Sequence, residues 1–253
     1  AATRLAQLHH RAGSQASAAF EQAWKRVGEW HQTHAEDMPQ SESMQRIEAQ
    51  WKTLGSSPSV EETDAFMVEL ITLGEAVADA SNLTLDPEIN AYVLMDAVFF
   101  KHPGAANQLA QLRDQGVRLN VGTATDTAVS ELGRAVGMLQ VAKNLLDRAQ
   151  PGIERVMQAR PAVAAALQAK FTDTQASLQA FTQLADRWLS GAPDVDATQF
   201  RAVGDAAVRS LLELRNGSII ALGEELALRQ GGYEHNRVIA LVALVASSLT
   251  ALY

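Results

Sequence analysis

Apolar residues recur three and four positions apart along nearly every long segment of this chain. The first such stripe covers about seven helical turns and consists of Leu5, Leu8, Ala12, Ala16, Ala19, Ala23, Val27 and Trp30. This spacing gathers side chains on one face of an α-helix, whereas a half-buried strand needs strict alternation of apolar and polar residues. The sequence therefore predicts an all-α fold.

Capping residues mark where several of the predicted helices begin. A helix over 41–54 is followed by a loop, after which Ser59 and Glu62 have the spacing of a capping box. Asp86 is followed by a proline suited to the first helical position, so we expect Asp86 to be the N-cap of another helix. Asp196, followed three residues later by a glutamine, predicts the start of the last helix.

Prolines and glycines divide the remaining helical segments. Pro103 and the glycine after it predict a kink, and 117–122 is interpreted as a loop. Pro151 predicts an interruption of the next helix, and a further helix is expected over 161–188. The chain thus contains about six to seven helices, arranged either as one elongated bundle or as two stacked four-helix modules.

Composition fits a helical bundle and excludes several functions. Hydrophobic residues make up 47% of the 253 residues but aromatic residues only 6%, so the core is expected to consist of small and aliphatic side chains. The formal net charge of −8 argues against a nucleic-acid partner, because phosphate binding rests on clustered Lys and Arg. The chain has no cysteine, which excludes disulfides and thiolate metal sites and is compatible with an oxidising compartment.

No motif in the sequence predicts catalysis, a cofactor or a metal. There is no glycine-rich phosphate loop, nucleophile elbow or HExxH motif, so we do not expect an enzyme. His31 and His34 are spaced to share a helix face near Glu36 and Asp37, which makes a metal site conceivable. A solvated helix end is the simpler interpretation, and no metal ligand is predicted.

The chain ends in an apolar run of 16 residues, 238–253, which carries no charge and follows Arg237. A bilayer core needs about 20 apolar residues in a helix. We therefore interpret 237–253 as the start of a transmembrane helix and 1–236 as an extracytoplasmic domain, with another span expected before Ala1. The alternative is a buried C-terminal helix of a soluble bundle.

Two stretches resemble known sensor domains. Residues 7–14 resemble the Q-x-x-R-G-x-S segment of nitrate-sensor-type helical input domains, although Ala12 here separates the arginine from the glycine. The block Ser81–Ala97, with the sequence SNLTLDPEINAYVLMDA, is similar to a block in periplasmic sensor regions of bacterial methyl-accepting chemotaxis proteins and of some membrane-bound histidine kinases and diguanylate cyclases. The resemblance implies an all-helical ligand-binding domain in the periplasm, held between two spans of the inner membrane and working as a dimer.

A small anion is the ligand that the sequence favours, because a guanidinium group matches carboxylates and planar oxyanions. Arg11 lies next to the first apolar stripe, and Arg134 borders another and serves as the reserve cation. The expected ligand-binding set is Arg11, Gln7, Gln15, Asn82, Tyr92 and Arg134. In the alternative interpretation Asp96 pairs with Arg11 or Arg134, and Tyr92 only packs.

These features together predict the sensor domain of a transmembrane chemoreceptor. A small ligand would shift the packing of the first and last helices, which also carry the predicted homodimer contacts, and the last helix would move the membrane span. One alternative is the sensor region of a histidine kinase or diguanylate cyclase. The other is a helical domain that binds no small ligand and serves a structural role or binds another protein.

Overall fold

A computed structural model describes residues 41–53, 59–121, 127–191 and 195–251, together with several helical positions between 22 and 33. Within these ranges side chains are described as far as Gln230, except at 41, 60, 120–121 and 127–129. Within these ranges every regular element is helical and there is no strand. The all-α prediction is therefore confirmed. Most of the first predicted helix lies outside the described residues.

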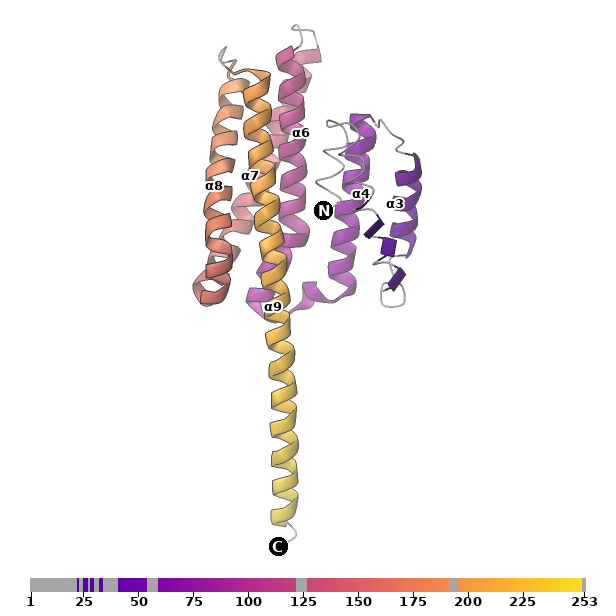
Figure 1. Ribbon diagram of the computed structural model, residues 1–253, viewed down its shortest axis with the longest axis vertical. Coiled ribbons are helices and arrows are strands. Elements are labelled where there is room, and N and C mark those ends of the chain that lie inside the picture. The colour runs from indigo at the N-terminus through magenta and orange to yellow at the C-terminus, as the bar shows by residue number, and fades with distance from the viewer. Residues whose placement is uncertain are drawn as a thin grey trace.

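The helices form an elongated bundle with a helical pair beside it (Figure 1). In chain order the elements are α3 (Ser41–Thr53), α4 (Val60–Ala80), the 3-10 turn η1 (Leu83–Leu85), α5 (Ile89–Met95), the π-helical turn η2 (Asp96–Lys101), α6 (His102–Val121), α7 (Thr127–Ala159), α8 (Pro161–Leu189) and α9 (Ala197–Ala251). Helices α6, α7, α8 and α9 pack against one another as the bundle, and α3 pairs with α4.

Three predicted helix starts are confirmed. The Ser59 hydroxyl oxygen accepts the Glu62 backbone N–H at 3.1 Å, and the Glu62 carboxylate accepts the Ser59 N–H at 2.7 Å, which completes the capping box. The Asp196 carboxylate accepts the Gln199 N–H at 2.7 Å, directly before α9. Pro161 is the first residue of α8, where its missing N–H costs nothing.

The predicted role of Asp86 as an N-cap is wrong. Helix α5 begins at Ile89 and Glu88 occupies the cap position. Asp86 lies two residues earlier, and its carboxylate accepts the Glu88 backbone N–H at 2.9 Å. The same carboxylate, which is almost fully buried, pairs with Arg229 of α9.

Helices α6 and α7 are longer than we predicted from the positions of prolines and glycines. Pro103 lies in the first turn of α6, directly after η2, whose π-helical turn changes the backbone hydrogen bonding there, and the predicted kink stays a prediction. The predicted loop at 117–122 is wrong as far as Val121, where α6 ends. Helix α7 continues through Pro151, since the apolar positions on both sides of the proline stay in phase and pack into one core. These positions are Ala149, Ile153 and Val156.

The bundle contains two buried clusters along its length. The first is built mainly from α6, α7, α8 and α9, and the second from α7, α8 and α9 together with α5, η2 and Ala78 of α4. The first core cluster includes Leu109, Leu139, Phe181, Phe200 and Leu211, and the Phe181 and Phe200 ring centroids lie 5.3 Å apart. The second core cluster includes Leu94, Ile153, Leu167, Leu214 and Leu222. In the described residues the two layers therefore belong to one bundle, while α3 and α4 enclose a smaller cluster of Ile47, Phe66 and Met67.

Helix α9 contributes to both core clusters and then continues beyond the bundle (Figure 1). Residues three and four positions apart on α9 form a stripe that is buried at Leu211, Leu214, Ser218, Ala221 and Glu225. Leu228 at its end is 63% exposed. In the described part of the chain no helix is both long and apolar enough to cross a membrane. The backbone of α9 is helical to Ala251, but the side chains of 237–253 lie outside the description, so the predicted span stays a prediction.

Candidate functional site

The structure describes only part of the predicted ligand-binding set. Arg11, Gln7 and Gln15 lie outside the described residues, as do His31 and His34. Asn82 is exposed in the turn before η1 and has a left-handed backbone with φ of 56°. The described residues contain no group of three or more His, Cys, Asp and Glu side chains that could hold a metal ion.

Tyr92 and Arg134 lie at different levels of the bundle. Tyr92 is 40% exposed on α5, next to Ala91 of the second core cluster. Arg134 is exposed on α7, next to Ala135 of the first core cluster. The structure thus does not bring these two residues together.

In the alternative interpretation Asp96 pairs with Arg11 or Arg134. Arg11 lies outside the described residues, and the pairing with Arg134 is not formed. Asp96 pairs with Lys101, and both residues belong to η2. The π-helical turn holds its first and last residues close enough for their side chains to meet. The described part of the set therefore forms no site of its own.

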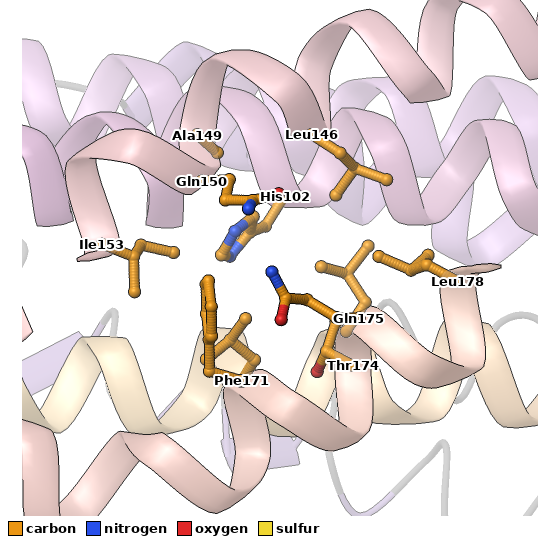
Figure 2. A pocket seen from close by; sticks show the side chains of 11 residues that line it. His102, Leu146, Ala149, Gln150, Ile153, Phe171, Thr174, Gln175 and Leu178 are labelled. Carbon is orange, nitrogen blue, oxygen red and sulfur yellow. The ribbon is translucent and has the colours of Figure 1, made fainter.

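A cavity lies in the bundle between the two core clusters (Figure 2). Helices α7 and α8 form its sides, and His102 of α6 together with Leu211 and Leu214 of α9 completes the lining. The other lining residues are Leu146, Ala149, Gln150, Ile153, Phe171, Thr174, Gln175 and Leu178. All four bundle helices thus contribute to it, and none of its lining side chains is a carboxylate, lysine or arginine.

The cavity has room for more than one water molecule. Its volume is about 30 Å³, and roughly 10–15 Å³ is enough for one water. Its walls are mostly aliphatic and aromatic, with polar groups from only four side chains. The lining, mainly apolar with a few polar groups, has the composition of a small-molecule site, but such sites usually have volumes of about 300–1,000 Å³.

His102 is the most unusual polar group in the lining. Its side chain is 1% exposed, and among the described residues its Nδ1 atom has no hydrogen-bond partner. Burial lowers the pKa of His102 to about 3, and the charges of Arg215 and Lys101 act in the same direction. The imidazole is therefore neutral at neutral pH, and one of its ring nitrogens lacks the partner that buried polar atoms normally have.

Three further polar side chains surround the cavity. The Thr174 hydroxyl lies 2.7 Å from the Lys170 carbonyl oxygen and 2.9 Å from that of Ser210 on α9. The Gln150 amide donates to Glu154 at 2.8 Å. The Gln175 residue is exposed, and Figure 2 shows its amide extending toward His102.

The π-helical turn η2 positions His102 and connects it to α9. The His102 backbone N–H donates to Ala97, five residues earlier, and the corresponding donor for the Val98 carbonyl would be Pro103, which has no N–H. Arg215 of α9 supplies the missing donor, with Nε 2.9 Å from the Val98 oxygen. Burial lowers the pKa of Arg215, because the guanidinium group is largely removed from water. Single π-turns of this kind are frequent at functional sites.

The sequence analysis did not identify the cavity residues. A usable signal was present at His102, which is in helical phase with Ala106 and Leu109 and therefore interrupts an apolar stripe. Gln150 and Thr174 carry no comparable signal, because their placement depends on how four helices meet. Comparison with known proteins adds no further assignment: no family model, curated protein or solved structure matches the chain.

Proposed function

We propose that this chain is the periplasmic sensor domain of a transmembrane receptor of the inner membrane, with a bacterial chemoreceptor as the leading type. A small molecule binds within the bundle, and α9 transmits the resulting displacement. The observation that carries the proposal is that α9 lines the cavity through Leu211 and Leu214 and then continues past the bundle toward the uncharged run 238–253. A ligand in the cavity is therefore in direct contact with the helix that leaves the domain.

Two ion pairs support a transmitting role for α9. Glu225, which is 8% exposed, pairs with Arg160 at the α7–α8 turn with 2.9 Å between Oε1 and Nε. One turn further on, Arg229 pairs with the buried carboxylate of Asp86. Both pairs hold the part of α9 where it leaves the bundle. A shift of α9 changes both contacts, so two packings of the bundle can differ in affinity for a ligand, as a switch requires.

A homodimer along α9 is part of the proposal. Ile220 and Leu228, about two helical turns apart on α9, are 65% and 63% exposed. Large apolar side chains exposed together on one helix favour contact with a second helix. The first predicted helix, which would share this interface, lies outside the described residues.

Vesicle flotation tests the membrane part of the proposal. The chain should float with phosphatidylcholine vesicles, and a variant carrying Leu241→Asp and Leu244→Asp should remain at the bottom, because each charge in the apolar run opposes insertion. Flotation of neither protein contradicts the membrane attachment.

A thermal-shift panel of organic acids, amino acids, nitrate and small uncharged compounds separates a sensor from a ligand-free structural domain. A ligand at 100 times its Kd adds about 2.7 kcal/mol of stability. A panel without any shift favours the structural alternative. The choice between chemotaxis and kinase or cyclase output depends on the domain that would follow the membrane span.

A further inference from the structure

We infer that Lys101 of η2 and Arg148 of α7 together form a binding site for a compact anion with two or more oxygen atoms, such as a small carboxylate. Neither residue lines the cavity, so the site is separate from it. The ligand class is the one that the sequence favoured, but the cations differ from Arg11 and Arg134. The inference goes beyond the proposed receptor function and does not depend on it.

The packing of α7 against the α5–η2–α6 segment brings Arg148 to η2. The Cδ1 atom of Leu145 lies 3.2 Å from the position that a Cβ on Gly104 of α6 would occupy. About two turns later, a Cβ on Gly152 would lie 3.0 Å from Cβ of Val93 in α5. Arg148 lies between these two contacts and on the same face of α7, because residues three and four apart share a helix face. It therefore lies beside η2, which connects α5 to α6.

The electrostatics of Lys101 agree with this placement. Its side chain is 13% exposed and pairs with Asp96 at the other end of η2. Burial lowers the pKa of Lys101, and the positive charge of Arg148 acts in the same direction. Arg148 itself is exposed and has no hydrogen bond or ion pair with another described residue. It is therefore free to bind an anion that also reaches Lys101.

Cations around η2 outnumber the carboxylates that pair with them. Arg215 donates to the Val98 carbonyl rather than to a carboxylate. Within the described residues, Asp96 is the carboxylate that pairs with one of the three cations. Two positive charges thus remain without a paired carboxylate, in a chain whose formal net charge is −8. Partial burial strengthens their attraction for an anion, because the local dielectric constant is lower than that of water.

The donor geometry of the two side chains selects the ligand class. The planar guanidinium group of Arg148 matches two oxygen atoms of a carboxylate or a similar oxyanion, whereas the ammonium group of Lys101 binds one oxygen at a time. Charge-assisted hydrogen bonds of this kind are about twice as strong as neutral ones. A short dicarboxylate can place one carboxylate on each cation, so it suits the site best.

Malonate is the probe, because its two carboxylates are joined by a single carbon atom. Malonamide has the same skeleton without charge and is the control ligand. Titration of the isotope-labelled whole chain at constant ionic strength, followed by the NMR shifts of its backbone amides, should show saturable malonate binding at η2 and around Arg148. Malonamide should bind at least about tenfold more weakly, because it forms no charge-assisted contact.

Three variants of α7 and one of η2 locate the site. Arg148→Gln and Lys101→Gln each remove one cation and should weaken malonate binding at least about tenfold. Arg148→Lys keeps the charge without the planar fork and should retain part of the affinity. Arg155→Gln is the matched control, since it removes an exposed arginine about two turns away on the same helix, and should change the Kd less than about twofold. If Lys101→Gln does not fold, the exposed position 148 alone decides.

Equal malonate binding by the unmodified chain and Arg148→Gln, or no saturable binding at all, overturns the site. Equal binding of malonamide overturns the anionic ligand class. An equal loss of affinity in Arg155→Gln shows that malonate senses only the general charge of α7, and also overturns the site. Vesicle flotation is unaffected by each of these results, so the site and the proposed membrane receptor fail or stand separately.

Discussion

Arg215 of α9 donates from Nε to the carbonyl oxygen of Val98, 2.9 Å away, and so holds α9 against the π-helical turn that precedes His102. The two residues are 117 positions apart in the chain. The contact replaces a backbone hydrogen bond that Pro103 cannot provide. A movement of α9 therefore affects the turn that positions the polar group of the cavity.

Replacing Arg215 with methionine should destabilise the domain. Arg215→Met leaves the Val98 carbonyl without a donor, which costs about 1–3 kcal/mol of unfolding free energy. Arg209→Met, at an exposed position of the same helix, should change stability by no more than about 0.5 kcal/mol. Urea denaturation at pH 7 measures both. Equal stability of the two variants would show that the Arg215 contact contributes little.

The depressed pKa of His102 predicts a loss of stability toward acidic pH. Below about pH 6.5 the imidazole gains a proton in the unfolded chain but not in the folded one, where its pKa is about 3. This difference lowers the unfolding free energy by up to about 1.4 kcal/mol per pH unit between these two values, and the contribution is fully present above pH 6.5.

Comparison with His102→Leu isolates this effect. Between pH 7 and pH 5 the unfolding free energy of the unmodified chain should fall by about 2 kcal/mol more than that of the variant. The carboxylates and the other histidines titrate in both proteins and cancel in the difference. A parallel decrease in the two proteins would mean that His102 is accessible to protons in the folded state.

Local signals predicted the fold better than the site. The Ser59–Glu62 capping box and Pro161 act on neighbouring backbone atoms, so the sequence alone determines their effect. Pro151 misled the prediction because tertiary packing on both sides of it outweighs the lost helix hydrogen bond. Asp86 was recognised as a residue that binds a nearby N–H, but its ion pair with Arg229 spans 143 positions and has no local signature.

The cavity was unpredictable for the same reason. Its lining comes from α6, α7, α8 and α9, and its empty space exists only after these helices have packed. His102 was visible as a polar residue in an apolar stripe, but its missing partner is a property of the assembled bundle. Sequence periodicity can indicate which face of a helix is buried, but it does not indicate where that face fails to fill the core.

Two glycines allow α6 and α9 to pack closely, and their substitution should be costly. A Cβ on Gly116 would overlap the ring of Phe200, and a Cβ on Gly204 would lie 2.6 Å from Cγ of Arg113. Gly116→Ala and Gly204→Ala should each lower the unfolding free energy by about 1–3 kcal/mol through overpacking. Thermal unfolding followed by circular dichroism measures the change.

Gly133→Ala is the matched control for these two substitutions. Gly133 lies within α7, is exposed, and has no atom within 4 Å of the position that a Cβ would occupy. Alanine there should raise stability by about 0.5–1 kcal/mol, because it restricts the unfolded chain and favours the helix. A stabilising effect at Gly116 or Gly204 as well would contradict the close packing of α6 and α9.

Asp86 should contribute to the unfolding free energy, although the residues next to it in the chain are exposed. Asp86→Ala removes the partner of Arg229 and the acceptor of the Glu88 N–H, and should cost roughly 1–3 kcal/mol. Asp173→Ala, on the exposed face of α8, should be nearly neutral. Hydrogen exchange of the Asp86 variant should increase in α9 around Arg229. Unchanged exchange there would mean that the pair does not hold α9 to the bundle.

Displacement of α9 by a molecule in the cavity can be measured with spin labels, because a chain without cysteines takes labels only at introduced positions. One pair is placed at the exposed positions Ala176 of α8 and Asn216 of α9, and a control pair at Gln168 and Gln179 within α8. A saturating concentration of a compound that raises the melting temperature in the thermal-shift panel should shift the electron-resonance distance distribution of the first pair and leave the control pair unchanged. Saturated binding with both distributions unchanged would contradict transmission through α9.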